Sequence, residues 1–597
     1  MPNAVDTARF QNLAEMFFAV AHSMGDRPFL WAKRDGAWQP TSWAEAASQA
    51  RSLALGLKAM GIEPGDRVGL VAENRPKWPI SDIAVMAAGA ISVPAYITNT
   101  VADHRHILAD CGARAVIVSN PRLGEAVIAA ALQVPSIKAV IAMDPGVAAP
   151  PGAKLRVLGW DEARALGASG DPTHLAGRRR SDTACLIYTS GTGGTPKGVM
   201  LSHGAILSNC KGATILLEKL GLDDEVFLSF LPLSHSYEHT AGLYFPISVG
   251  AQIYYAEGAD KLAANLPEAK PTIMTAVPRL YETMHQRITA GVERSGGFKA
   301  KLFHRAVALG RKKYDAPGSL SIVERLEDAI LDKLVRDKVR ARFGGRLKAL
   351  VSGGAPLNPE IGLFFYALGV RILQGYGLTE SGPVANCNPP YAERMHTVGP
   401  PIHGCEVRIV ADGEILIRGE NVMQGYWGLK DLTDQTIKDG WLHTGDIGVI
   451  DPDGYLRITD RKKDIIVNSG GDNVAPQRVE GFLTMTPEIG QAMVFGDRKP
   501  YLVAVIVPRQ EFLESWATAH KREPLLPRVA ADPELHKALT SAVERVNANL
   551  SVLERVRRIT VAGEPFSVAN GMMTPTMKVR RHVVKETYGK ALEELYG

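Results

Sequence analysis

The stretch TACLIYTSGTGGTPKGVMLSH, residues 183–203, is the most informative segment of the chain. Its apolar run at residues 184–188 predicts a strand, which leads into a loop of Ser, Thr and Gly ending in Pro196 and Lys197. We expect a helix after the loop, beginning near Ser202 or Ser208, because serine is a favoured residue at helix N-termini. The order of strand, polar loop and helix is typical of an α/β protein.

The composition of this loop fits a bound polyphosphate. Gly191, Gly193 and Gly194 allow backbone N–H groups to approach phosphate oxygens closely. Further hydrogen-bond donors, including one ammonium group, come from Thr189, Ser190, Thr192, Thr195 and Lys197. The Walker pattern G-x-x-x-x-G-K-[ST] fails, because the sixth position from Gly191 is Pro196. The loop therefore favours a nucleotide site outside the P-loop ATPases over an ordinary surface loop.

Short apolar runs alternate with helical patterns on both sides of the loop. Residues 68–73, 91–94, 115–119 and 138–143 predict strands, and residues 79–90 and 105–111 predict helices. The alternation recurs with strands at 251–256 and 271–278 and a helix from Pro278. This order predicts mostly parallel sheets covered by helices.

The pattern changes after about residue 400. Short alternating strands at 407–410, 414–418, 447–450 and 455–459 have Asp-Gly turns at 412–413 and 453–454, which predicts hairpins. Strands at 492–495 and 502–507 precede an amphipathic helix that begins at Asp532-Pro533 and carries apolar residues from Leu535 to Leu553. Charged and turn residues cluster at 461–464, which predicts a boundary there.

We therefore expect an α/β fold in two domains. The larger, residues 1–462, has helix-covered, mostly parallel sheets plus a small β-barrel-like subdomain. The smaller, residues 463–597, is an α+β C-terminal domain.

Composition excludes several classes of protein. The chain has 597 residues, with 68 Lys and Arg against 63 Asp and Glu, and the net charge of +5 is too weak for a dedicated nucleic-acid binder. Five scattered cysteines without a C-x-x-C pair argue against a disulfide framework and predict a reduced, cytoplasmic protein. We expect no signal peptide and no membrane span. Basic stretches at 311–313 and 333–346 are more typical of a solvated helix face than of a lipid site, although peripheral contact with the inner membrane face stays open.

YTSGTGGTPKG, residues 188–198, resembles the signature loop of adenylate-forming enzymes, the superfamily of acyl-CoA synthetases, luciferases and peptide-synthetase adenylation domains. Gly193 stands where the family has threonine, which removes a hydroxyl and keeps the backbone amides. Further motifs follow in the family's order: SGGAPL at 352–357, QGYGLTES at 374–381, WLHTGDIG at 441–448, DRKKD at 460–464 and NGMMTPTMKVRR at 570–581. The resemblance covers nearly the whole chain.

This resemblance implies that residues 1–462 bind ATP and the acyl substrate, and that residues 463–597 form a mobile lid that carries the catalytic lysine. Residues 189–195 and Lys197 would hold the β- and γ-phosphates, and Asp446 and Arg461 would contact the ribose or the phosphates. Residues expected along the adenine pocket, with an aromatic ring for stacking, are Gly353, Gly354, Ala355, Gln374, Gly375, Tyr376 and Gly377. Thr379 would lie near the α-phosphate. Glu380, together with Thr189, would bind Mg²⁺, which prefers oxygen ligands.

It also implies the catalytic residues. Lys578 matches the family's catalytic lysine, and His235 borders the acyl carboxylate and gates the substrate tunnel. Lys463 falls at the hinge, and Gly470 and Gly471 would form walls of a tunnel for the pantetheine arm of CoA. His239 lies outside the family pattern, and a zinc site with His235 is disfavoured because no third ligand is evident.

The predicted reaction is the ATP-dependent conversion of a fatty acid, long-chain by resemblance of the segment at 509–561, to acyl-AMP and then to acyl-CoA. The expected partners are the fatty acid, ATP, Mg²⁺ and CoA, with no nucleic acid. Two alternatives stay open: an acyl-AMP ligase that loads a carrier protein, and a CoA ligase for an aromatic or other acid. A non-catalytic relative is disfavoured because Lys578 and Glu380 are both present.

Overall fold

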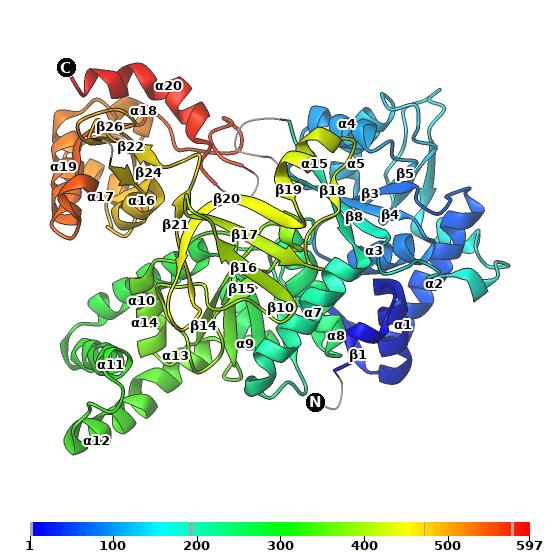
Figure 1. Ribbon diagram of the computed structural model, residues 1–597, viewed down its shortest axis with the longest axis horizontal. Coiled ribbons are helices and arrows are strands. Elements are labelled where there is room, and N and C mark those ends of the chain that lie inside the picture. Colours follow the sequence, from blue (N-terminus) through cyan, green and yellow to red (C-terminus); the bar gives the residue numbers. More distant parts are fainter. Residues whose placement is uncertain (1–3, 190–194, 471, 575–577) are drawn as a thin grey trace.

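Two eight-stranded sheets carry much of the secondary structure of the computed structural model (Figure 1). The structure describes residues 4–189, 195–470, 472–574 and 578–597. Six residues predicted for the site lie outside these ranges: Ser190, Gly191, Thr192, Gly193, Gly194 and Gly471.

The first sheet has the strand order β18-β9-β8-β4-β3-β5-β6-β7. Its strands are β3 (Arg67–Val71), β4 (Ile91–Pro94), β5 (Ala115–Val118), β6 (Ala139–Ala142), β7 (Arg156–Gly159), β8 (Thr183–Thr189), β9 (Lys197–Ser202) and β18 (Gly425–Tyr426). The strands from β8 through β7 in this order pair in parallel, because helices connect most of them in sequence. These helices are α3 (Lys77–Ala87), α4 (Val101–Asp110) and α5 (Pro121–Ala131), and α2 (Trp43–Ala59) and α6 (Trp160–Ala165) pack nearby.

The second sheet has the order β15-β14-β13-β12-β10-β11-β1-β2. Its strands are β1 (Pro28–Arg34), β2 (Ala37–Ser42), β10 (Val226–Ser229), β11 (Gln252–Tyr255), β12 (Ile273–Ala276), β13 (Ala349–Ser352), β14 (Ile372–Tyr376) and β15 (Asn386–Cys387). Its helices are α1 (Leu13–Met24), α7 (His203–Leu217), α8 (Phe245–Ser248), α9 (Leu262–Ala269), α10 (Pro278–Ser295) and α14 (Pro359–Ala367). The largest hydrophobic core joins both sheets through fully buried residues such as Phe29, Val68 and Ile206.

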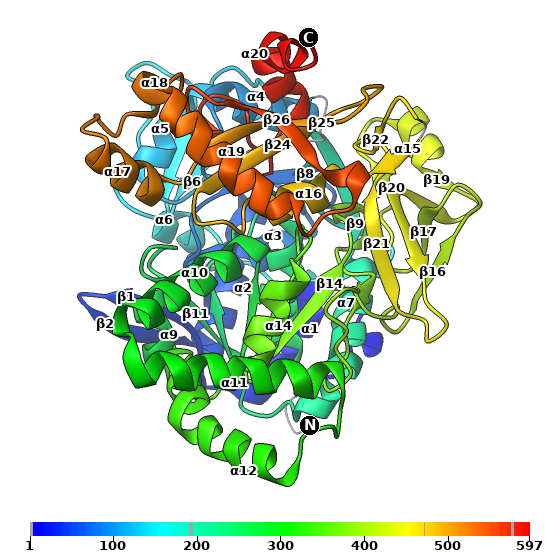
Figure 2. The same cartoon turned by 90° about the vertical axis from the view of Figure 1, so that its left-hand side faces the viewer.

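A helical extension lies between β12 and β13 in the chain. It comprises α11 (Gly297–Asp315), α12 (Ile322–Leu331), the π-helix η5 (Asp332–Arg336) and α13 (Asp337–Arg342). Helix α12 lies at the periphery of the molecule in both views, at the end opposite the C-terminus (Figures 1 and 2).

The predicted β-rich unit is a five-stranded antiparallel sheet. It contains β16 (Cys405–Ile409), β17 (Glu414–Gly419), β19 (Ile437–Lys438), β20 (Trp441–Ile450) and β21 (Leu456–Arg461), and α15 (Lys430–Thr436) precedes β19. Gly413 and Gly454, at the two predicted Asp-Gly turns, have φ angles of +84° and +86°, which glycine adopts without steric strain.

The C-terminal part, residues 463–597, has its own sheet and core. The hairpin of β22 (Ile466–Val467) and β23 (Asn473–Val474) precedes a sheet of β24 (Ile489–Phe495), β25 (Leu502–Pro508) and β26 (Val556–Val561). Its helices are α16 (Pro476–Leu483), α17 (Gln510–Ala519), α18 (Leu526–Val529), α19 (Pro533–Asn547) and α20 (Arg581–Glu594). These elements confirm the predicted α/β fold with an additional β unit and an α+β C-terminal part.

Two expectations about local structure are wrong. The predicted phosphate loop connects the antiparallel strands β8 and β9, not a strand and a helix, because the apolar residues after Gly198 pair with β8. Helix α7 follows β9, and Ser202 caps it as predicted. Helix α19 ends at Asn547 rather than near Leu553, because the Asn547 side chain hydrogen-bonds the backbone N–H and C=O of Val556 at 3.0 and 2.8 Å.

No helix in the described ranges is long and apolar enough to cross a membrane.

Candidate active site

Lys578 of the C-terminal part lies near charged side chains of the N-terminal part. The backbone of Lys578 exchanges two hydrogen bonds with Thr574, at 3.1 and 2.8 Å. The Lys578 side chain keeps contact with solvent. Protein atoms nevertheless surround the ammonium, and this partial desolvation lowers its pKa to about 8. Repulsion from Arg461 adds to this decrease, whereas Asp446 and Glu380 oppose it. Three sequence motifs far apart in the chain therefore meet at Lys578.

Asp446 is held by two neighbours from different strands. The Tyr376 hydroxyl at the end of β14 donates a hydrogen bond of 2.7 Å to Asp446 Oδ2. Arg461 Nε lies 3.1 Å from Asp446 Oδ1, and the two residues are direct partners of β20 and β21. Burial raises the pKa of Asp446 although Arg461 acts against it. The pair presents a fixed acceptor and a fixed donor near Lys578.

Glu380 and Lys197 share a partner that the sequence did not indicate. The Tyr426 hydroxyl donates to Glu380 Oε1 at 2.9 Å, and Lys197 Nζ lies 5.6 Å from the centre of the Tyr426 ring. Tyr426 is positioned because β18 pairs with β9, the strand that begins at Lys197. Thr189 lies directly opposite Lys197 across the hairpin. The described ends of the predicted phosphate loop are thereby linked to Glu380.

Thr379 and His235 lie on neighbouring segments. Thr379 Oγ1 and Ser236 Oγ are 3.0 Å apart, and His235 Nδ1 accepts a hydrogen bond from the Tyr237 amide at 3.2 Å. Burial, reinforced by Lys578, lowers the pKa of His235 to about 4. The imidazole is therefore neutral at physiological pH.

The glycine motifs are places of close backbone approach. A Cβ at Gly353 would lie 2.9 Å from the Tyr237 ring, and one at Gly377 would overlap the carbonyl oxygen of Pro383. Gly354 has a φ of +81°. Ala355 and Gly375 belong to the same two turns, and the Gln374 side chain is buried with no partner for its Oε1 in the described part of the chain.

Other predicted residues are not part of this cluster. Lys463 is exposed in the turn after β21, in which the amides of Asp464 and Ile465 donate to the carbonyl of Arg461. Gly470 is exposed in the turn between β22 and β23, and Thr195 is exposed beside the loop. His239 is a buried packing residue, whose Nε2 lies 2.9 Å from Asp82 Oδ2.

An apolar cavity of about 50 Å³ lies behind Tyr237. Its lining combines the segment of Tyr237, Thr240, Ala241 and Phe245 with residues of α7, β12 and β13. Thr275 and Val384 line it from two further segments. The α7 wall is formed by Asn209, Ala213, Leu216 and Leu217.

Tyr426 and Ser236 were not among the predicted site residues. Their roles depend on contacts with Glu380 and Thr379 that are distant in sequence, and no local pattern indicates such contacts.

Comparison with known proteins identifies the relatives of this chain. The family described as AMP-binding enzyme matches residues 17–427, and the AMP-binding enzyme C-terminal domain matches residues 463–597. Long-chain-fatty-acid–CoA ligase FadD15 of Mycobacterium tuberculosis is 34% identical over 100% of this chain and 99% of its own length. Peroxisomal long chain acyl-CoA synthetase 7 of Arabidopsis thaliana is 31% identical over 99% of this chain and 87% of its own.

Among solved structures, the adenylation domain of a carboxylate reductase from Mycobacterium chelonae aligns with a TM-score of 0.75 and 26% identity. The alignment covers 98% of this chain and 91% of that one. The adenylation and carrier-protein didomain of the Segniliparus rugosus carboxylic acid reductase, solved in complex with AMP, aligns with a TM-score of 0.76 and 23% identity, over 99% and 83%.

Proposed function

Because the chain belongs to the AMP-binding enzyme family, we propose that it is a long-chain-fatty-acid–CoA ligase. The carboxylate of the fatty acid attacks the α-phosphorus of ATP, and pyrophosphate leaves with the electrons of the broken P–O bond. The thiol of CoA then attacks the acyl carbon of acyl-AMP, and AMP leaves. The long-chain assignment rests on curated relatives that match the whole chain at 31–34% identity.

One observation carries the catalytic part of this proposal. Lys578, among the last 20 residues of the chain, is close enough to Arg461, Asp446 and Glu380 of the N-terminal part for their charges to act on its pKa. With a pKa of about 8, Lys578 is mostly protonated at pH 7 and can neutralise negative charge. Opposite charges that the surrounding protein partly desolvates attract more strongly than in bulk solvent.

The first step needs positioning and charge neutralisation, and no covalent nucleophile. Lys578 contacts the α-phosphate and the acyl carboxylate, and Thr379 donates its hydroxyl near the same phosphate. His235 is neutral, so it borders the carboxylate without fixing it as an ion pair. Thr195, Lys197 and the loop at 190–194 hold the β- and γ-phosphates.

A second group of residues binds the nucleoside. Asp446, oriented by Tyr376, accepts hydrogen bonds from the ribose hydroxyls, and Arg461 is a second contact. The turns at Gly353–Gly354–Ala355 and at Gln374–Gly375–Tyr376–Gly377 are the proposed border of the adenine. Glycine keeps these turns compact, since a larger residue at Gly353 or Gly377 would collide with the Tyr237 ring or the Pro383 carbonyl.

The residues at Glu380 fit a magnesium ion. Tyr426 binds Oε1 of Glu380, which leaves Oε2 as a ligand. Thr189 would supply a hydroxyl from the β8–β9 hairpin, where it lies opposite Lys197, which contacts the same Tyr426 ring. In the described ranges there is no group of three His, Cys, Asp or Glu side chains suited to a metal. A site with one carboxylate suits Mg²⁺, which relies on substrate phosphates and water for its other ligands. When bound, the ion neutralises phosphate charge.

We assign the acyl chain to the cavity behind Tyr237. Its lining is almost entirely apolar, as a fatty acyl chain requires. Its volume of about 50 Å³ is far below the roughly 300–1,000 Å³ of ligand pockets, so side chains along α7 move when a long chain enters.

Thioester formation requires Lys578 to leave and CoA to enter. We propose residues 1–462 and 463–597 as two domains that rotate about Lys463, as hinge motions do in other enzymes. Gly470 and Gly471 then line the path of the pantetheine arm. The cytoplasm is the proposed location, since all five cysteines are free.

The test is pyrophosphate release with acids from acetate to palmitate, and with cinnamate, in the presence of CoA or of a phosphopantetheinyl carrier protein. We expect activity to increase toward palmitate and palmitoyl-CoA to form with free CoA. Release with cinnamate alone, or transfer to the carrier protein alone, contradicts the assignment.

A further inference from the structure

Helix α12 turns its charged residues toward the protein and its apolar residues toward solvent. Ile322, Val323, Leu326 and Ile330 are 78, 74, 64 and 54% exposed, and Leu334 in the following π-helix is 47% exposed. These positions lie on one face at helical spacing. We call this surface the α12 face. An exposed apolar stripe on a soluble helix marks a contact with another surface.

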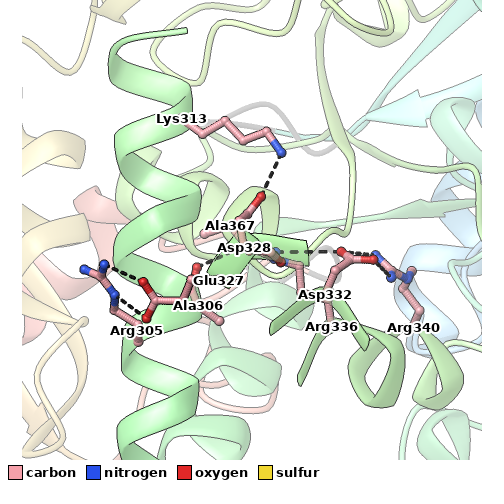
Figure 3. Close-up of polar contacts among 9 residues, drawn as sticks. All are labelled: Arg305, Ala306, Lys313, Glu327, Asp328, Asp332, Arg336, Arg340 and Ala367. Atoms are coloured by element: carbon pink, nitrogen blue, oxygen red, sulfur yellow. Dashed lines mark hydrogen bonds and ion pairs between the residues drawn. The ribbon is translucent and has the colours of Figure 1, made fainter. Parts of the chain in front are cut away.

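Ion pairs fix this orientation of α12 (Figure 3). Arg305 on α11 binds Glu327 at 2.7 Å, and Lys312 and Lys313 bind Glu324 and Asp328 at 2.7 and 3.1 Å. The buried guanidinium of Arg336 bonds Asp328 at 2.7 Å and the carbonyls of Ala306 and Ala367 at 3.1 and 2.7 Å.

The inward side of α12 is also packed. Leu331 is buried in a small core with Ala306, Leu309 and Leu320, and Ser321 caps the helix through a reciprocal bond with Glu324. Rotating α12 to bury its apolar face would break these contacts together. The exposure of the face is therefore built into the fold.

The charge of the extension indicates what covers the face. Residues 297–346 contain 13 Lys and Arg against six Asp and Glu, a net charge of +7, whereas the whole chain carries +5. Exposed basic residues near the apolar stripe are Lys299, Lys301, Arg325, Lys333 and Lys338. A symmetric contact with a second copy would bring two +7 segments together, which electrostatic repulsion disfavours. Apolar residues flanked by cations match the boundary of an anionic lipid bilayer.

We propose that the α12 face docks the protein on anionic lipid membranes, with Ile322, Val323, Leu326 and Ile330 inserted among the acyl chains and the basic residues on the headgroups. Phe298 at the start of α11 is also 74% exposed. The site lies at the opposite end from the C-terminal part (Figures 1 and 2), so docking leaves the proposed hinge motion free. The proposal concerns location and does not depend on the acid that the enzyme activates.

The test is co-sedimentation of the full-length protein with phosphatidylcholine vesicles, with or without about one third phosphatidylglycerol. We expect binding to the anionic vesicles that weakens with salt, and little binding to phosphatidylcholine alone.

The double variant I322S/L326S should lower the partition coefficient roughly tenfold or more. R325E/K333E should lower it by at least about fivefold per charge on anionic vesicles alone. V552S, which changes an equally exposed valine in the C-terminal part, should bind like the parent protein.

Two further measurements keep the result unambiguous. Pyrophosphate release with a water-soluble short-chain acid should be unchanged in all variants. A variant with lower release is checked for a folding defect by thermal melting. If I322S/L326S binds anionic vesicles as the parent does, or if the parent binds both vesicle types equally, the proposal is wrong. A concentration-dependent dimer that I322S/L326S dissociates would assign the face to a second copy instead.

Discussion

The N-terminal and C-terminal parts of this protein are built around different hydrophobic cores. The large core spans both eight-stranded sheets and the β unit, from Leu13 to Leu456, whereas the second core runs from Ile466 to Leu592, and the two share no residue. Among the described residues, the side-chain hydrogen bonds that cross between the parts are few and polar, such as that from Arg509 to Gln286 at 2.8 Å.

The separation of the two hydrophobic cores indicates where the molecule can move. Rotation of the C-terminal part would break polar contacts that water can replace, without exposing either core. The environment of Lys578 depends on that rotation, because its pKa is lowered by desolvation and is further changed by Arg461, Asp446 and Glu380 of the other part. The predictions below test whether the two parts act separately.

The largest effect is expected for Lys578→Ala. Acyl-adenylate formation, measured as pyrophosphate release, should decrease roughly 10²–10³-fold, because a cation at the reacting phosphate is lost. Thioester formation from supplied acyl-AMP should stay within a few-fold of the parent. Lys590→Ala, at a lysine with a 93% exposed side chain, is the matched control. Equal loss of both half-reactions would contradict separate action of the two parts.

Lys463→Pro should have the converse effect. Proline fixes φ and restricts the preceding residue, so the turn at 461–465 would lose its freedom to rotate. We expect thioester formation to decrease about tenfold while acyl-adenylate formation is retained. Lys463→Arg keeps a flexible backbone and should behave as the parent does. A proline variant with normal thioester formation would place the pivot elsewhere.

A smaller effect concerns Asp460, whose carboxyl lies at the boundary between the parts. Burial raises its pKa to about 7, and Glu480 and Asp464 contribute while Arg581 opposes. The folded state then holds a proton that the unfolded state has lost, so stability falls as pH rises from about 4 to 7. Asp460→Asn should raise the free energy of unfolding by about 1 kcal/mol at pH 8 and not at pH 4, as measured by urea denaturation. An unchanged pH profile would show that Asp460 ionises normally.

The smallest effect is expected for Gln286→Ala, which removes the acceptor of the crossing hydrogen bond from Arg509. A net loss of about 0.5–1 kcal/mol in contact between the parts should change the ratio of the two half-reactions by less than about fivefold. A loss comparable with that of Lys578→Ala would mean that the interface is rigid.

The sequence predicted the framework because its signals are local. Strand Ile91–Pro94 has the predicted bounds, and Ser202 and Asp532 cap their helices as expected. The hairpin at β8–β9 could not be separated from a strand-loop-helix unit, since a short apolar run is compatible with either. Helix α19 ends early because of a long-range contact of Asn547 with Val556.

The candidate site was predicted to a similar degree. Motifs identified Lys578, Glu380, Asp446 and Arg461, and the structure brings them together. Tyr426 was not predicted, because its role depends on the pairing of β18 with β9 across more than 200 residues. The α12 face was also missed, because an amphipathic pattern does not state which side of a helix faces the protein.

The turn after β21 has one more consequence. Within the described residues, a backbone turn at 461–465 and side-chain hydrogen bonds such as that from Arg509 to Gln286 join two parts with separate hydrophobic cores. We expect that a C-terminal part grafted from a relative would need to match this joint rather than an interlocking interior. Because Lys578 belongs to the grafted part, such an exchange would retune the second half-reaction alone only if the graft also supplied this lysine at the same place.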